Sequence, residues 1–256
     1  MTITYELENG VATVLIARPD RKNAIDRPTQ IALHEIFQQM HDDREVRAVV
    51  LGGEGGNFCA GADLGKAGGA DIAGSMTNVH IFQRMIRSVT MLPKPVVAAV
   101  EGVSVGLGWS LAMSADFVIA AKDARFRSAF RHLGLVPDGG ASYHLVRLVG
   151  LQRAKELVYT GRFVSGEEAA AIGMALEALP AEEVMPRAQA LARELAEGPT
   201  LALALSKSQL TYAATQSLEE ALTMEVSMQP LMTRSEDFQE GIAAFRERRP
   251  VQFKGK

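Results

Sequence analysis

Two turns of small residues are the parts of this chain best suited to chemistry. They are Phe58–Leu64, with the sequence FCAGADL, and Gly102–Leu111, with the sequence GVSVGLGWSL. Each follows a mostly apolar run, Val46–Leu51 or Val96–Val100, which predicts a buried strand that ends in a turn. Glycine and alanine leave room for backbone N–H groups to face a ligand instead of a neighbouring strand. The two turns together could bind one oxyanion.

These turns resemble those of the enoyl-CoA hydratase/isomerase (crotonase) family. Other segments that resemble the family occur in the family's order along nearly the whole chain, and the pattern is closest to the enoyl-CoA isomerases of phenylacetate breakdown. These segments are Arg18-Pro19 with Asn23-Ala24, Pro93–Val100, Gly134–Gly140, and a tail with Glu240-Gly241 and Phe245–Pro250. The resemblance implies an acyl-CoA thioester as substrate. Coenzyme A is then part of the substrate, and no separate cofactor is expected.

In the family each turn supplies one peptide N–H group to the thioester oxygen, and by position the donors here are those of Ala62 and Leu107. Such donors stabilise the enolate that forms when the α-carbon loses its proton, and each is typically worth about 10² to 10³ in rate. The alternative is that the small residues only let two backbones pass closely. The resemblance further implies a substrate site made of Lys22, Ala24, Ala60, Gly61, Asp63, Leu64, Gly106, Trp109, Ser110 and Phe130.

The carboxylates decide which reaction follows, and here the sequence departs from the hydratase pattern. Hydratases of the family use two glutamates, whereas the matching positions here hold Ser110 and Phe130, which do not titrate in the useful range. Asp138 matches the acid/base aspartate of the family's isomerases. One carboxylate is enough for a 1,3-proton shift, because it can take a proton from one carbon and return it to another. The alternative role of Asp138 is to cap a helix that begins near Gly139.

Other reactive groups and motifs have simpler explanations. Asp63 is expected to hold the first turn through an Asx-type hydrogen bond, whereas Asp71 lies in a Gly/Ala-rich segment, residues 65–74, predicted to be a flap that could close over the site. Cys59 has no base near it in the sequence, which disfavours a nucleophilic role. A dinucleotide site is disfavoured because Leu111 stands where Gly-x-Gly-x-x-Gly needs its third glycine. An enoyl-CoA hydratase, and a family member that binds acyl-CoA without turnover, remain as alternatives to an isomerase.

Composition limits the class of protein further. With 256 residues, of which 47% are hydrophobic and 22% charged, the chain is typical of a soluble globular protein. The net charge of −3 provides no basic field for nucleic acid. The single cysteine excludes an intrachain disulfide, the five histidines show no metal-binding spacing, and no apolar run approaches the roughly 18 residues that span a bilayer. We therefore expect a cytoplasmic protein without a nucleic-acid or membrane partner.

The pattern of elements predicts an α/β fold. Asn9-Gly10 between the apolar runs Ile3–Leu7 and Val11–Ile16 predicts a hairpin, because a type I′ turn needs positive φ. Strands predicted at 46–51, 96–100 and 116–121 then alternate with helices at 28–40, at 79–91 and from 106 onward. This alternation suits the spiral of ββα units that the resemblance implies.

The chain after Gly161 is predicted to be largely helical. Ser165–Glu168 and Ser217–Glu220 both have the capping-box sequence that starts a helix, and Gly198-Pro199 indicates a hinge between helices. We therefore divide the chain into a ββα core, residues 1–197, and a C-terminal helical region, residues 198–256. Such a region mediates assembly in the family, so the resemblance implies a homotrimer or a pair of trimers.

Overall fold

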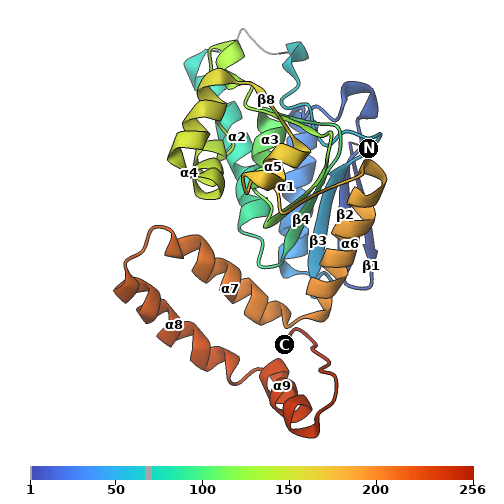
Figure 1. Ribbon diagram of the computed structural model, residues 1–256, viewed down its shortest axis with the longest axis vertical. Coiled ribbons are helices and arrows are strands. Elements are labelled where there is room, and N and C mark those ends of the chain that lie inside the picture. Colours follow the sequence, from blue (N-terminus) through green and yellow to red (C-terminus); the bar gives the residue numbers. More distant parts are fainter. Residues whose placement is uncertain (1, 67–70) are drawn as a thin grey trace.

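The computed structural model describes residues 2–66 and 71–256 and contains a six-stranded sheet with the strand order β1-β2-β3-β4-β6-β9 (Figure 1). The first two strands form the predicted antiparallel hairpin, in which Asn9 and Gly10 have φ of 49° and 79°. All later neighbours in the sheet pair in parallel. The strands are β1 (Ile3–Glu8), β2 (Val11–Ile16), β3 (Ala48–Gly53), β4 (Val96–Val100), β6 (Phe117–Ala121) and β9 (Glu177–Leu179).

Helices cover this sheet and bury its central strands. All five residues of β4 are buried, as expected for a parallel strand with both faces covered. The helix α6 (Ala181–Glu197) packs against β3, β4 and β6, and α1 (Arg27–Asp42) packs against α2 (Ile72–Thr90). The core of the molecule therefore lies around the sheet, and loops at the strand ends remain available for a site.

A second sheet of three short strands carries the Gly102–Leu111 turn. Its order is β5-β7-β8, formed by β5 (Val103–Val105), β7 (Arg125–Arg127) and β8 (Phe163–Ser165). The chain leaves β5 through Gly106 and enters α3 (Leu107–Met113) directly. Between β7 and β8 lie the short helix η3 (Phe130–Leu133) and α4 (Ala141–Thr160), and α5 (Gly166–Ala171) follows β8.

The helix α2 begins seven residues earlier than the predicted start at 79. Its first turn is capped by Asp71, whose carboxylate accepts the N–H of Gly74 at 2.8 Å. Of the predicted flap, residues 65 and 66 therefore belong to the short helix η2 (Leu64–Lys66) and residues 71–74 to the capped start of α2, and closure over the site stays a prediction. Residues 67–70 lie outside the described residues.

The two predicted capping boxes differ in the structure. Ser217 and Glu220 form a complete box at the start of α8 (Leu218–Met232). At the start of α5, Ser165 accepts the N–H of Glu168, but the Glu168 carboxylate binds Arg162 at 2.6 Å instead of returning to the cap. The second box is therefore only half formed, because a guanidinium is the stronger partner for that carboxylate.

The last helices extend away from the core (Figure 1). Gly198 ends α6 and Pro199 precedes α7 (Thr200–Ala213), so the predicted hinge between helices is confirmed. Arg47, just before β3, holds this junction by donating to Gly198 O at 2.7 Å and to Thr200 Oγ1 at 3.0 Å. Beyond α7 lie α8 and α9 (Glu236–Glu247).

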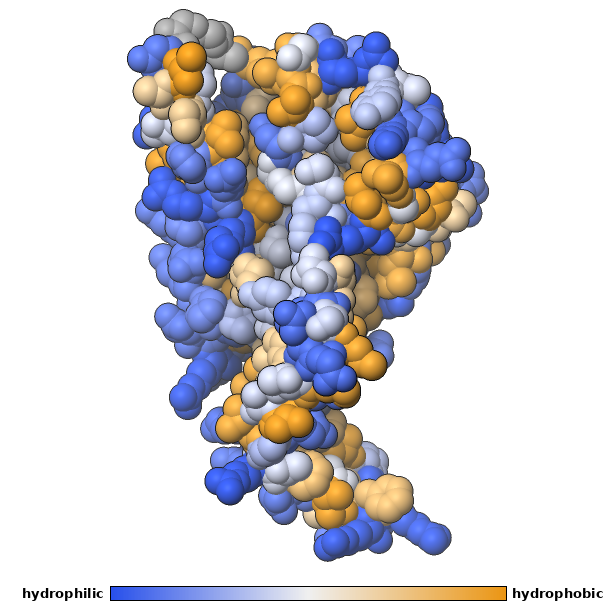
Figure 2. Space-filling model, turned by 90° about the vertical axis from the view of Figure 1, so that its left-hand side faces the viewer, coloured by the Kyte–Doolittle hydropathy of each residue, from blue (hydrophilic) through white to orange (hydrophobic). Residues whose placement is uncertain are grey.

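These C-terminal helices expose apolar side chains. The side chains of Leu210, Val226 and Phe245 are 75%, 74% and 83% exposed, and α8 has no buried residue. Figure 2 shows hydrophobic surface along the narrow lower part of the molecule that these helices form. Large apolar side chains are therefore on the surface of these helices, interspersed with polar ones (Figure 2).

Candidate active site

The two sequence turns lie side by side. Cys59 and Ser104 form an isolated parallel bridge, in which Cys59 N donates to Val103 O at 2.9 Å and Val105 N donates to Cys59 O at 3.0 Å. Gly61 requires the absence of a side chain, because a Cβ there would lie 2.7 Å from Val105 O and 3.7 Å from Leu107 N. The peptide of Gly61 is therefore packed directly against the start of α3.

Two backbone N–H groups remain free where the turns meet. Within residues 2–66 and 71–256, neither Ala62 N nor Leu107 N donates a backbone hydrogen bond. Three residues beside them have engaged N–H groups: Gly61 N donates to Cys59 Sγ at 3.3 Å, Asp63 N to Ile25 O at 2.9 Å, and Gly106 N to Arg127 O at 3.0 Å. Leu107 is the first residue of α3, where a helix leaves its N–H groups without an acceptor of its own. Backbone donors in a folded core are almost always paired, so two adjacent free donors are suited to bind an oxyanion.

Asp138 lies next to the second turn, on the loop between η3 and α4. Its backbone carbonyl accepts the Ser110 hydroxyl at 2.9 Å, and the next residue, Gly139, packs against Ser110 and Leu107. One carboxylate oxygen, Oδ1, is buried and has no hydrogen-bond partner within the described part of the chain. Burial raises the pKa of Asp138 from 3.8 to about 6.

Asp138 does not cap α4. The N-cap is Gly140, which makes no side-chain cap hydrogen bond, and only the backbone oxygen of Asp138 bonds to the helix, through Ala141 N at 3.1 Å. The alternative of a capping role is therefore wrong, because the positive φ of both Gly139 and Gly140 turns the chain before the helix begins. An unpartnered, desolvated carboxylate is a candidate for proton transfer.

Phe130 and Ser110 stand where hydratases of the family have their two glutamates, and both are buried. Phe130 is apolar, and the Ser110 hydroxyl is hydrogen-bonded. Phe130 is 6% exposed, and Ser110 is completely buried with its hydroxyl 2.9 Å from Asp138 O and 3.2 Å from Gly106 O. Ser110 therefore ties the Asp138 loop to the second turn instead of holding a water molecule.

Some residues of the expected coenzyme A groove contact one another around the first turn. Lys22 O accepts the N–H of Ala60 at 2.9 Å, and the Arg18 guanidinium donates to Ala24 O. The side chain of Leu64, after the turn, is 52% exposed. Asn23, completely buried between Lys22 and Ala24, holds this arrangement. Lys22 and Ala60 are therefore in contact, and the coenzyme A groove stays a prediction.

Trp109 is a correction to the predicted site. Its side chain is 1% exposed, and the indole N–H donates to Met174 Sδ at 3.3 Å. Because α3 turns this residue toward the core, the Trp109 side chain does not line a surface that a substrate could reach.

The other acids and the thiol have structural roles. The Gly65 N–H and then the Arg18 guanidinium hold the pKa of Asp63 below its ordinary value, and the bond from Gly65 N at 3.1 Å confirms the expected Asx-type interaction. Burial raises the pKa of Cys59 to about 12, which makes its thiol a poor nucleophile.

Sequence reasoning missed the shifted pKa values of two groups, Glu101 and His144. Burial raises the pKa of Glu101, directly after β4, and lowers the pKa of His144 to about 4, with a smaller contribution from Arg147. His144 borders Gly140 and lines a cleft of about 690 Å³ between α2, α4 and α7. The only signal for Glu101 in the sequence is a lone acid between a buried strand and Gly102.

The described residues contain neither a membrane-spanning helix nor a cluster of metal ligands. None of the helices that the structure describes is long and apolar enough to cross a membrane. Among residues 2–66 and 71–256, no group of three or more His, Cys, Asp or Glu side chains is arranged to hold a metal ion.

Comparison with known proteins decides the family. The sequence model of the enoyl-CoA hydratase/isomerase family matches residues 6–256. The chain belongs to this family. The family resemblance and the crotonase fold expected from the sequence are thereby confirmed, and an acyl-CoA thioester fits the family as substrate.

Relatives of this family member have different stated activities. A 1,2-epoxyphenylacetyl-CoA isomerase of Escherichia coli is 39% identical over 99% of this chain and 98% of its own length. A crotonyl-CoA hydratase of Syntrophomonas wolfei is 31% identical over 98% of this chain and 97% of its own length. The crystal structure of an enoyl-CoA hydratase from Bacillus anthracis superposes with a TM-score of 0.95 at 30% identity and covers both chains fully. Family membership therefore leaves isomerisation and hydration both open.

Proposed function

We propose that this protein shifts the double bond of an unsaturated acyl-CoA. The observation that carries the proposal is a single desolvated carboxylate, Asp138, beside two free backbone N–H groups, with no carboxylate at positions 110 and 130. Hydration needs one group to activate water and a proton source for the α-carbon, whereas a double-bond shift needs one base. The relative named 1,2-epoxyphenylacetyl-CoA isomerase also favours an isomerase.

In this mechanism the thioester oxygen binds between the N–H groups of Ala62 and Leu107. Asp138 removes a proton from the α-carbon of a 3-enoyl-CoA, and the electron pair moves through the carbonyl to give a dienolate whose oxygen the two donors stabilise. The same proton then returns from Asp138 to the γ-carbon, so the product is the 2-enoyl-CoA and no cofactor is consumed. A pKa of about 6 suits both steps near neutral pH, because the carboxylate is mostly ionised before the reaction and remains a usable acid afterwards.

The test compares two reactions on the purified protein. A 3-enoyl-CoA of four to eight carbons is expected to be isomerised at least tenfold faster than crotonyl-CoA is hydrated, and Asp138→Asn is expected to abolish isomerisation while acyl-CoA affinity stays within about tenfold. Faster hydration would favour the hydratase alternative. Tight acyl-CoA binding without turnover of either ester would favour the non-catalytic alternative.

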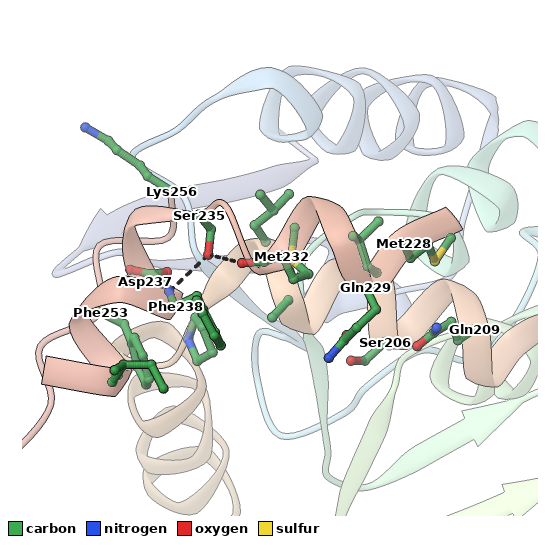
Figure 3. Close-up of a pocket in the computed structure, with 16 residues that line it drawn as sticks. Ser206, Gln209, Met228, Gln229, Met232, Ser235, Asp237, Phe238, Phe253 and Lys256 are labelled. Carbon is green, nitrogen blue, oxygen red and sulfur yellow. Dashed lines mark hydrogen bonds between the residues drawn. The ribbon is translucent and has the colours of Figure 1, made fainter. Parts of the chain in front are cut away.

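We also propose that the protein assembles as a homotrimer or a pair of trimers through its C-terminal helices. Support comes from their exposed apolar side chains and from a groove of about 330 Å³ between α7, α8 and α9, lined by residues such as Met228, Met232 and Phe238 (Figure 3). A small helical layer cannot bury this surface on its own core, so symmetric copies of the chain are the expected cover. Light scattering at micromolar concentration should give three or six times the mass of 27.6 kDa, and a monomer would contradict the proposal.

A further inference from the structure

Arg127 connects the second turn with the loop that carries Asp138. It is the last residue of β7, which pairs in parallel with β5 and antiparallel with β8. Its backbone carbonyl accepts the N–H of Gly106 at 3.0 Å, immediately before the free N–H of Leu107. The main chain of Arg127 therefore helps to orient one of the two proposed oxyanion donors.

The side chain of Arg127 reaches η3 and the end of α4, the two elements that flank the Asp138 loop in sequence. Its Nε donates to Gly161 O, at the end of α4, over 2.7 Å, and its Nη2 lies 2.5 Å from His132 Nε2 in η3. Because a guanidinium only donates, His132 Nε2 accepts this bond. The guanidinium also stacks 4.6 Å from the ring of Phe163 on β8. One side chain thus holds η3 and the end of α4 to the second sheet.

The loop between η3 and Asp138 has few anchors of its own, and η3 is held besides by its buried Phe130 and by Arg131, whose guanidinium donates to Tyr159 O near the end of α4. Leu135 and Val136 are 56% and 80% exposed, and besides the bond from Leu135 N to Phe130 O the loop is tied mainly by Ser110 at Asp138 O. Proton transfer to carbon depends steeply on position, and a misplacement of about 1 Å can cost about a hundredfold in rate. The anchoring of η3 therefore bears on where the Asp138 carboxylate sits.

We infer that Arg127 is a positioning residue that fixes the Asp138 loop relative to the N–H of Leu107. The inference rests on the proposed function, since it assigns Arg127 to the same proton transfer. Arg127 does not touch the substrate in this assignment. It acts through Gly106 on one side and through His132 and Gly161 on the other.

Arg125 provides a matched control on the same strand. Its guanidinium stacks 4.0 Å from the same Phe163 ring, but in the described part of the chain its side chain makes no hydrogen bond to η3 or α4. Arg125→Gln and Arg127→Gln thus remove the same charge and the same kind of stacking. Only Arg127→Gln removes the anchor of the loop.

The first experiment measures steady-state isomerisation of a 3-enoyl-CoA by both variants. Arg127→Gln is expected to lower kcat about 10- to 100-fold with KM within about threefold, and Arg125→Gln is expected to change both by less than about twofold. The pH–rate profile of Arg127→Gln should also show the apparent pKa of Asp138 falling from about 6 toward 3.8, because a looser loop lets water reach the carboxylate. Burial is the cause of that raised pKa, so loss of the distant Arg127 charge has no direct effect on it.

The second experiment separates this inference from the proposed function. Hydrogen exchange of residues 130–138 in the full chain should be faster in Arg127→Gln than in wild type or Arg125→Gln, whatever the reaction turns out to be. If Arg127→Gln does not fold, His132→Leu removes the acceptor alone and should lower kcat about tenfold, whereas His132→Gln keeps an acceptor oxygen and should stay within about threefold. Three outcomes would overturn the inference. They are unchanged exchange and kcat in Arg127→Gln, an equal loss of kcat in both arginine variants, and a rise in KM alone in Arg127→Gln. If wild type isomerises no ester, but exchange of residues 130–138 is still faster in Arg127→Gln than in wild type, only the proposed function is refuted.

Discussion

Replacing Asp138 by asparagine should abolish isomerisation and at the same time stabilise the folded protein. The carboxyl group has a pKa of about 6 in the folded state against an ordinary value of 3.8, because burial disfavours its charge. At neutral pH the folded protein must therefore hold an ionised carboxylate in a site that favours the protonated form. Asparagine has nearly the same shape and no charge, so it removes this cost together with the base.

The sign and size of the effect follow from the two pKa values. Between pH 3.8 and about 6 Asp138 binds more protons in the folded state than in the unfolded state, so its contribution to the free energy of unfolding falls as pH rises through this window and is constant above it. A difference of about 2 pH units corresponds to about 3 kcal/mol for a fully buried group. Asp138 is partly exposed, and solvent screening reduces this to roughly 1 kcal/mol. For a chain of this length, that is an increase in Tm of about 2 to 4 °C.

The assay is urea or thermal unfolding of wild type and Asp138→Asn at pH 7.5, 5.0 and 4.0, with isomerase activity measured on the same samples. The variant should be more stable at pH 7.5, and its advantage should shrink as the pH approaches 4. Asp71→Asn is the control, since asparagine also caps helices well and should leave both stability and activity nearly unchanged. A variant less stable than wild type at pH 7.5, an advantage independent of pH, or retained activity would refute the reasoning.

Three further predictions concern Leu107, Asn23 and His144. Leu107→Pro removes a proposed N–H donor and should lower kcat by about a hundredfold or more, whereas Leu107→Ala keeps the donor and should cost less than tenfold; equal losses in the two variants would refute the role of that N–H. The Asn23 side chain accepts a hydrogen bond from Arg18 N and donates to Glu54 O and Asn57 O, at a residue with φ of 57°. Asn23→Ala removes these bonds and should lower the free energy of unfolding by about 3 kcal/mol in urea titrations. A loss below about 1 kcal/mol would contradict this. Because the pKa of His144 is lowered to about 4, its contribution to the free energy of unfolding should be lost as pH falls from 6.5 to 4. Unfolding curves over that range should therefore show the stability of His144→Gln rising relative to wild type, and a difference independent of pH would contradict this.

The sequence by itself determined the features that depend on neighbouring residues. The Asn9-Gly10 hairpin, the buried strand β4 and the hinge at Gly198 each follow from a short run of residue types, and each is found at its expected place. The two small-residue turns were also visible locally, because glycine is needed wherever a backbone must pass another closely. The short strands β5, β7, β8 and β9 were not predicted, since three residues are too few to show a period.

Only the tertiary structure decided which groups in those segments are free to react. Whether the N–H of Leu107 is satisfied depends on strands that come from distant parts of the chain, and whether Asp138 caps a helix depends on the turn made by the glycines after it. Burial likewise moved Trp109 from the expected site into the core and raised the pKa of Asp138. Hydrogen bonding and desolvation are properties of packed surroundings, and contacts between residues far apart in the sequence are not encoded in any local pattern.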